Sequence, residues 1–231
     1  MSREALTLPV EGAGRVSALL DLPAQPRAAL VLAHGAGAGM QHAFLGQLAN
    51  ELVARDVAVL RFNFAFMQQG VKRPDPPPRA HAAVRSAVDA ARHHLPGVPL
   101  FAGGKSFGGR MTSQAQALEA LPDVHGLVFV GFPLHPAGKP SRTRAEHLAQ
   151  VGLPMLFLQG TRDTLADIGL VREVTGELAD RATLHVIDGA DHAFHVLARS
   201  GRTDGQVLQE LAQVSAAWMA GHAGSTGAGV S

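Results

Sequence analysis

The sequence predicts a single α/β domain in which helices flank a mostly parallel sheet. Continuous apolar runs of strand length alternate with segments whose apolar residues recur at helical spacing, and this alternation continues along most of the chain. Continuous apolar runs are typical of strands buried on both faces, and helices between them indicate crossover connections between parallel strands. No linker or change of composition divides the 231 residues, so we expect one domain rather than two.

The expected elements follow in chain order. Two apolar stretches separated by Gly12 and Gly14 predict an antiparallel hairpin over residues 5–22. Apolar runs then predict strands over 28–33, 57–62, 100–103, 127–132, 154–158 and 183–187. Helical spacing predicts helices over 44–53, 79–95, 107–120, 143–150, 169–179 and 205–220. We expect a loop over 65–78, a domain that covers 1–220, and a disordered tail over 221–231, where small and polar residues dominate.

Charge and composition exclude several classes of function. The chain has 20 Lys and Arg against 19 Asp and Glu and no basic stripe, so we expect neither nucleic acid nor an anionic membrane as a partner. The lack of cysteine excludes disulfides, a thiol nucleophile, cysteine-ligated zinc and iron–sulfur clusters. No apolar stretch approaches the roughly 18 residues that span a bilayer, and the first residues do not form a signal-peptide core. We therefore expect a cytoplasmic protein.

The most informative segment is GKSFGG at 104–109, which joins an expected strand to an expected helix. A serine at such a sharp turn has a strained backbone that exposes its hydroxyl, and the positions two before and two after it must be very small. Gly104 and Gly108 meet that demand, so the pattern predicts Ser106 as a nucleophile. The alternative is that Ser106 only caps the helix. A phosphate-binding loop would need a glycine where the sequence has Pro99.

A nucleophilic serine needs a base, and the base needs an orienting carboxylate. In this type of turn the acid and then the base follow the serine along the chain. Asp163 comes just after the expected strand 154–158, and His192 comes after 183–187, so both should lie at the carboxyl ends of parallel strands. Nearby alternatives are Asp167, Asp191 and His195. The histidines form no His-Glu-x-x-His pattern, so we expect no metal.

A second glycine-rich segment, HGAGAG at 34–39, follows the expected strand 28–33. Hydrolysis through a serine develops an oxyanion that needs two backbone donors. We expect the amide after the nucleophile, that of Phe107, and one from this early loop, with Ala36 first and Gly37 close behind. The alternative is a plain glycine turn. A dinucleotide fingerprint is disfavoured because Met40 stands where its third glycine belongs.

Taken together, these motifs resemble the α/β-hydrolase fold, and specifically its small dienelactone-hydrolase-like members. The matching stretches are LAHGAGAGM at 32–40, RFNFAFM at 61–67, GGKSFGGRM at 103–111, GFPLHPAGKP at 131–140, RAEHL at 144–148, LQGTRD at 158–163 and GADHAFH at 189–195. The sequence looks closer to one branch of that group, which also holds a testis-expressed protein and a subunit of a histone-acetyltransferase complex.

The resemblance implies that Ser106 is the nucleophile, Asp163 the orienting acid and His192 the base of an esterase-like acyl hydrolase without a cofactor. Two departures from the pattern of the branch stand out. The run 164–166 is Thr-Leu-Ala where Pro-Phe-Gly is expected, and Phe132 stands where a tyrosine is common. We therefore expect the loop after Asp163 to differ in shape from that of the branch, and we expect no pocket hydroxyl at position 132.

The length of one connection bears on the substrate. Only about twenty residues follow the expected strand 127–132 before the next strand, too few for a large cap domain, so we expect an open site. We expect the substrate to contact Gly37, Met40, Phe64, Phe132 and Arg144. Further apolar candidates for the wall are Phe66, Met67, Phe107 and Phe194. Arg144 lies in a basic segment with Lys139 and Arg142. Because arginine pairs well with a carboxylate, one of these side chains is a candidate to bind an anionic group of the substrate. The alternative is a solvated basic loop.

The sequence thus leads to a serine hydrolase that acts on a small-molecule ester, thioester or lactone. Two alternatives stay open at this stage. One is a non-catalytic interaction module that keeps the fold, which the resemblance to a complex subunit suggests. The other is an acyltransferase, which would prefer an alcohol or amine to water as the acyl acceptor.

Overall fold

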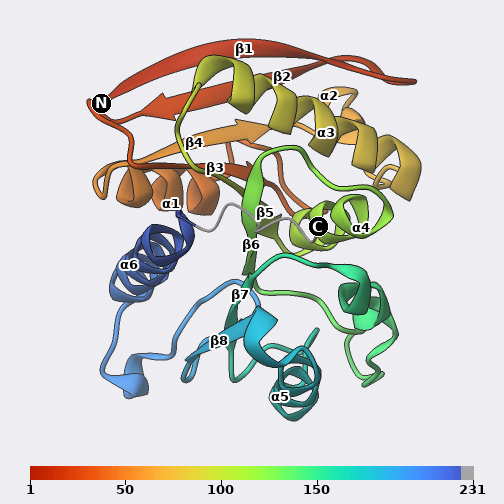
Figure 1. Ribbon diagram of the computed structural model, residues 1–231. Coiled ribbons are helices and arrows are strands. Elements are labelled where there is room, and N and C mark those ends of the chain that lie inside the picture. Colours follow the sequence, from red (N-terminus) through yellow and green to blue (C-terminus); the bar gives the residue numbers. More distant parts are fainter. Residues whose placement is uncertain (225–231) are drawn as a thin grey trace, which may run out of the picture.

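A twisted sheet of eight strands runs through the molecule, with helices on both of its faces (Figure 1). The computed structural model describes residues 1–224, and the strand order within them is β1-β2-β4-β3-β5-β6-β7-β8. β1 (Ser2–Val10) and β2 (Gly14–Leu22) form an antiparallel hairpin, and β2 also pairs antiparallel with β4 (Val57–Phe62). The remaining neighbours are parallel, so the predicted fold class is confirmed.

The other elements lie close to their expected positions. The remaining strands are β3 (Ala28–Ala33), β5 (Leu100–Lys105), β6 (Val124–Val130), β7 (Met155–Gly160) and β8 (Ala182–Ile187). The helices are α1 (Ala43–Val53), α2 (Ala65–Gln68), α3 (Pro77–His94), α4 (Phe107–Leu118), α5 (Ile168–Glu177) and α6 (Asp204–His222). The expected loop 65–78 therefore contains the short helix α2 and the first two residues of α3. That helix begins at a proline, whose missing N–H costs no helical hydrogen bond there.

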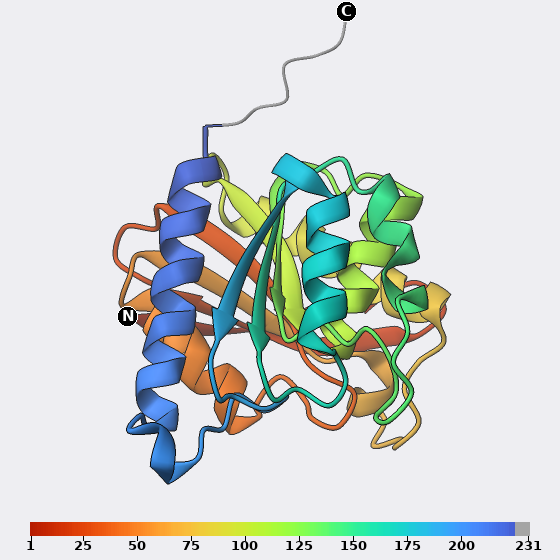
Figure 2. The ribbon, with the colours of Figure 1, turned by 90° about the horizontal axis from the view of Figure 1, so that it is seen from below.

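The sheet separates two hydrophobic cores. α1 and α6 pack on one face, and α3, α4 and α5 on the other, as the view from below shows (Figure 2). Every residue of β3, β4 and β7 is buried, which explains why these strands appear in the sequence as continuous apolar runs. The parallel order brings the carboxyl ends of β3, β5, β7 and β8 to the same edge of the sheet.

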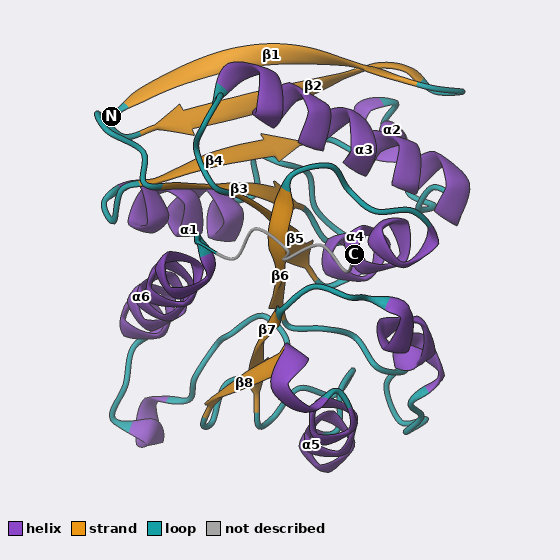
Figure 3. Ribbon diagram, in the orientation of Figure 1, coloured by secondary structure: helices purple, strands orange, loops and turns teal. Residues whose placement is uncertain are grey.

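The connection from β6 to β7 contains a 3₁₀ helix, Thr143–Gln150, between stretches of loop (Figure 3). No domain is inserted there, in agreement with the length of that segment in the sequence. At the other end of the chain, α6 continues to His222, two residues past the expected end of the last helix. Residues 225–231 of the expected tail lie outside the described residues. None of the helices within 1–224 has the length and apolar character needed to cross a membrane.

A buried ion pair joins the hairpin to the parallel part of the sheet. Asp21 and Arg61 lie on adjacent strands, their side chains are 0% and 2% exposed, and Arg61 Nη2 donates to Asp21 Oδ2 over 2.7 Å. Arg3 on β1 contacts the other oxygen of the same carboxylate. Arg61 Nη1 also donates to the backbone oxygen of Met40 over 2.7 Å, so the pair extends to the loop that follows β3.

We expect Asp21→Ala to lower the free energy of unfolding by about 3–5 kcal/mol, because it leaves the guanidinium of Arg61 buried without a counter-charge. Urea denaturation measures the change. Glu51→Ala is the matched control, since Glu51 on α1 pairs with Arg55, two residues past the end of that helix, with both side chains partly exposed. That control should cost less than about 1 kcal/mol. Equal small losses in the two variants would show that the buried pair does not join the hairpin to the sheet.

Candidate active site

Ser106 occupies the sharp turn between β5 and α4. Its φ is 51° and its ψ is −116°, a conformation that is strained for any residue other than glycine. A Cβ atom at Gly104 would lie 2.5 Å from the carbonyl oxygen of Ala33, and one at Gly108 would lie 2.6 Å from the same oxygen. The two glycines therefore let α4 start directly against β3. The side chain of Ser106 makes no capping hydrogen bond to α4, unlike the alternative considered from the sequence.

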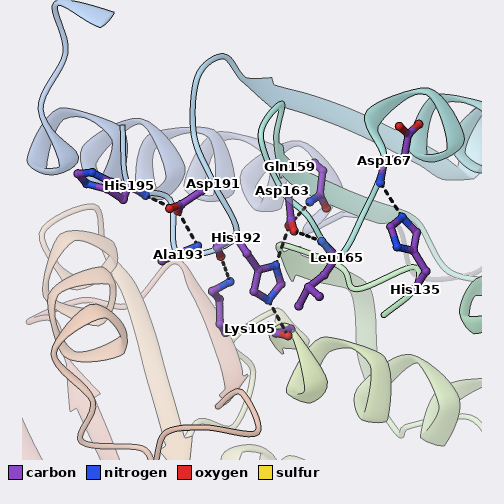
Figure 4. A network of polar contacts seen from close by, with 11 residues as sticks. Lys105, His135, Gln159, Asp163, Leu165, Asp167, Asp191, His192, Ala193 and His195 are labelled. Carbon is purple, nitrogen blue, oxygen red and sulfur yellow. Dashed lines mark hydrogen bonds and ion pairs between the residues drawn. The ribbon is translucent and has the colours of Figure 1, made fainter. Parts of the chain in front are cut away.

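Ser106, His192 and Asp163 lie in one hydrogen-bonded row. Figure 4 shows the imidazole of His192 directed at Asp163. The Nε2 atom of His192 is 2.8 Å from the hydroxyl oxygen of Ser106, and its Nδ1 atom is 2.7 Å from Oδ2 of Asp163. Since a carboxylate only accepts, Nδ1 carries the proton and Nε2 accepts from the serine hydroxyl. The row can therefore move the hydroxyl proton of Ser106 onto the imidazole.

Asp163 is the most enclosed member of this row. Its side chain is 1% exposed, and two further donors hold it: Gln159 Nε2 at 2.6 Å and the amide of Leu165 at 2.8 Å. Three donors to one buried carboxylate compensate for its lost hydration. They also fix the direction in which it meets His192.

The alternative acids and base from the sequence make other contacts. Asp167 caps α5 by accepting from the amide of Leu170, and Asp191 accepts from two amides of its own loop, those of Ala193 and His195. The exposed imidazole of His195 pairs with Asp204. These contacts stabilise a helix end and a loop, and none of them involves the hydroxyl of Ser106.

The loop 34–40 passes beside the nucleophile. A Cβ atom at Gly35 would lie 3.7 Å from the Cβ of Ser106, and Ala36, Gly37 and Ser106 line the same cleft. Within the described residues, the amide of Ala36 donates no hydrogen bond to a backbone carbonyl. The amide of Phe107 belongs to the first residue of α4, where amides have no acceptor inside the helix. Of the two expected donors, Ala36 lines the cleft, and Phe107 directly follows Ser106, which also lines it.

Three polar side chains anchor that loop, and the sequence did not assign this role to any of them: His34 and Arg61 are buried, and Asn63 is partly buried. His34 Nδ1 donates to the carbonyl of Gly35 over 2.7 Å, and His34 Nε2 accepts from the amide of Phe64 over 3.0 Å. At the other end of the loop, Asn63 Oδ1 accepts from the amide of Met40 over 2.9 Å, and Arg61 donates to its carbonyl. In the sequence, these residues stood only within the stretches LAHGAGAGM at 32–40 and RFNFAFM at 61–67, and neither stretch indicates an anchoring role by itself.

The cleft beside Ser106 has a volume of about 750 Å³. It is lined by the loop after β3, the start of α1 and the loops after β5, β7 and β8, with these residues: Gly35, Ala36, Gly37, Ala38, His42, Phe44, Leu45, Lys105, Ser106, Arg162, Thr164, Leu165, Asp191, His192 and Ala193. A larger surface groove of about 990 Å³ between β1 and α3 holds none of the row Ser106–His192–Asp163. The smaller cleft is therefore the candidate active site.

Four of the five residues expected to contact substrate do not line this cleft. Gly37 does, but the side chains of Met40, Phe64 and Phe132 are at most 4% exposed and belong to the protein interior. Phe64 packs against the rings of Phe62, Phe66 and Phe107, and Phe132 against those of Phe129 and Phe157. These aromatic side chains fill the space between the sheet and the helices on that face.

Arg144 also lies outside the cleft, on the 3₁₀ helix Thr143–Gln150 that packs on α4. Burial and then the positive charge of Arg144 lower the pKa of Arg110, which places the two guanidinium groups near each other. Its neighbour Arg142 pairs with Glu173 and Glu177 on α5. Arg142 and Arg144 therefore contact these helices, and neither they nor the exposed Lys139 line the cleft at Ser106.

Comparison with known proteins connects this geometry to a family. A family model described as an alpha/beta hydrolase domain matches residues 26–220. An α/β serine hydrolase without a lid from Xanthomonas campestris is 23% identical, with 93% of this chain and 95% of that chain covered and a TM-score of 0.71. The esterase domain of a Rhodothermus marinus protein is 17% identical, with 97% and 100% covered and a TM-score of 0.73. A dienelactone hydrolase from Anabaena variabilis is 18% identical, with 96% and 98% covered and a TM-score of 0.75.

The buried imidazole of His34 makes stability depend on pH. Burial lowers the pKa of His34 to about 4, although its hydrogen bond to Gly35 opposes the shift. Between about pH 4 and about pH 6.5, the unfolded chain binds a proton at this residue that the folded chain does not. The stability that the neutral imidazole of His34 contributes is therefore fully present above about pH 6.5. It is lost as the pH falls from there toward about 4.

We therefore expect His34→Gln to weaken the dependence of unfolding free energy on pH between 4.5 and 6.5 by about one proton. Urea denaturation at several pH values measures that slope. Burial also lowers the pKa of His147 to about 4, so adding His147→Gln should flatten the dependence further. A slope that His34→Gln leaves unchanged would contradict the neutral, buried state of this imidazole.

Proposed function

Because the chain belongs to the alpha/beta hydrolase family, we propose that it is a serine hydrolase that cleaves a small ester, thioester or lactone. The observation that carries the proposal is the row of hydrogen bonds from Asp163 through His192 to Ser106 at the wall of an open cleft. Structures of similar fold support it, since they are described as a serine hydrolase without a lid, an esterase domain and a dienelactone hydrolase.

The proposed reaction uses these residues in order. The hydroxyl oxygen of Ser106 attacks the substrate carbonyl carbon, and its proton passes to Nε2 of His192 while Asp163 stabilises the imidazolium. The amides of Ala36 and Phe107 donate to the oxyanion that forms. When the bond to the leaving oxygen or sulfur breaks, that atom takes the proton from His192 and Ser106 keeps the acyl group. Water then attacks the acyl-enzyme by the same route, which releases the acid and restores the serine.

Several features of the cleft support a small substrate. The loop 35–38 presents only glycine and alanine to it, and no inserted domain covers it in residues 1–224. The proposal includes carboxylic esters as the principal substrates and a place in the dienelactone-hydrolase-like branch that the sequence resembles. It also includes a cytoplasmic location, which the lack of cysteine in the sequence supports.

The strain at Ser106 favours a hydrolase over a non-catalytic module. A non-glycine residue with positive φ at a turn of this kind costs about 1–3 kcal/mol. A glycine at position 106 would relieve that strain and preserve the turn. A serine is useful there when its hydroxyl must reach His192.

The proposal is tested by covalent labelling with a fluorophosphonate, read by intact mass. We expect one adduct on the wild-type protein and none on Ser106→Ala. Ser113→Ala is a matched control, because Ser113 also contacts a histidine, with 2.7 Å between its Oγ and Nε2 of His147, but lies fully buried on α4. This control should be labelled like the wild type.

An unlabelled, folded wild type would contradict the proposal and favour the interaction module. If labelling occurs, a panel of short esters, thioesters and lactones follows, with and without an added alcohol or amine. Faster turnover with the added acceptor, together with acyl transfer to it, would indicate an acyltransferase.

A second prediction concerns the acid. We expect Asp163→Asn to slow labelling and ester turnover by about 10³- to 10⁴-fold, because an amide cannot hold His192 in the tautomer that accepts from Ser106. Asp167→Asn provides the control, since that side chain caps α5 and does not contact His192. Similar rates for the two variants would remove Asp163 from the proposed mechanism.

A further inference from the structure

We infer that Lys105 is a positioning residue for the base: its ammonium group holds the backbone carbonyl of His192 (Figure 4), while the next residue in the chain, Ser106, meets the imidazole ring. This inference rests on the proposed function. The hydrolysis mechanism itself assigns no step to Lys105. The two consecutive residues therefore attach to the same histidine at two points, one on its backbone and one on its ring.

The loop that carries His192 shows why such an attachment is useful. An antiparallel bridge between Ala190 and Val196 closes it into a tight hairpin with His192 near its tip. Inside the hairpin, the carboxylate of Asp191 accepts from the amides of Ala193 and His195. These contacts fix the shape of the tip but not its distance from the nucleophile. The hydrogen bond from Lys105 Nζ to the carbonyl of His192 joins the tip to the end of β5.

The surroundings of the ammonium group are shaped to receive it. Nζ lies 5.1 Å from the centre of the Phe194 ring, within the range of a cation–π interaction. Phe194 itself is 2% exposed and adopts a positive φ of 63°. On another side, a Cβ atom at Gly131 would lie only 3.0 Å from Nζ, so the glycine leaves the space that the ammonium needs. The end of the side chain is therefore held from three directions.

Charge alone does not explain this lysine. Burial lowers the pKa of Lys105 to about 8, and the negative charges of Asp163 and Asp191 oppose that shift. Arg162 lines the same cleft and donates to the carbonyl of Gly189 in the base loop. A positive charge beside His192 disfavours the imidazolium that forms during the reaction. The effect of its charge on the imidazolium alone would thus make the enzyme faster without Lys105, whereas a positioning role makes it slower.

The two roles separate in Lys105→Met, which keeps the length of the side chain and removes the ammonium. Replacing a buried charge by an apolar group of similar size is often neutral or stabilising, so we expect the melting temperature to stay the same or rise. We expect the rate of fluorophosphonate labelling at Ser106 to fall by about 10- to 100-fold, because small misplacements of a reacting group cost that much. Lys139→Met, at an exposed lysine outside the cleft, should keep the wild-type rate.

A measurement that needs no catalysis accompanies the labelling. The proton on Nδ1 of His192, shared with Asp163, should give a far-downfield proton resonance, assigned by its loss in His192→Gln. We expect this resonance in the wild type and in Lys139→Met, and its broadening or loss in Lys105→Met. Lys105→Gln, which keeps a shorter donor in the same space, provides the comparison if the methionine variant does not fold.

The outcomes separate the two proposals. If the wild type is not labelled, the proposed function fails, and the resonance alone decides whether Lys105 holds His192. If the wild type is labelled, a Lys105→Met rate equal to or above the wild-type rate overturns the inference, whatever the spectrum shows. A slower rate with loss of the resonance and unchanged melting supports it.

Discussion

The close packing of three backbone segments at the end of β5 is the constraint on which the whole site depends. A Cβ atom at Gly103 would lie 1.9 Å from the carbonyl oxygen of Val128, and Gly104 and Gly108 bring β5 and α4 equally close to Ala33. Only glycine allows the chain to leave β5, turn at Ser106 and start α4 directly on the sheet. This packing fixes the position of the turn at Ser106. The loops after β3, β7 and β8 are then placed around that turn.

Polar side chains hold two of those loops in place, and most of these side chains are buried. The loop after β3 depends on His34, Asn63 and Arg61, and Arg61 in turn depends on Asp21 of the hairpin. The acid loop depends on Gln159, a residue of β7 that is fully buried. Arg61 and Gln159 lie on strands, and His34 and Asn63 directly follow the ends of β3 and β4, so the rigidity of the sheet extends into segments that have no regular structure.

The sequence was sufficient to predict the fold class, because runs of residues buried on both faces leave a simple pattern. It also indicated the residues of the row Ser106–His192–Asp163, because each follows a predicted strand and the spacing of Gly104 and Gly108 has a steric cause. The sequence did not distinguish residues that line the cleft from residues of the core. Met40, Phe64 and Phe132 are apolar residues near motifs, and apolar residues occur in the cleft as well as in the core. The anchoring roles of His34 and Asn63 were missed because each depends on a partner about 23–30 residues away, which no local pattern reveals.

In the loop 34–40, the residues that anchor the loop differ from those that line the cleft, and this has a consequence for the evolution of the protein. Its ends are hydrogen-bonded to β4 and the residues just after it through the buried side chains of His34 and Arg61 and the partly buried side chain of Asn63. The part that faces the cleft has only the small residues Ala36, Gly37 and Ala38. Exchange of the small side chains at 36 and 38 for larger ones would narrow or reshape the cleft without touching the anchors. Selection for a new substrate can therefore act on these positions while the geometry around Ser106 is inherited unchanged.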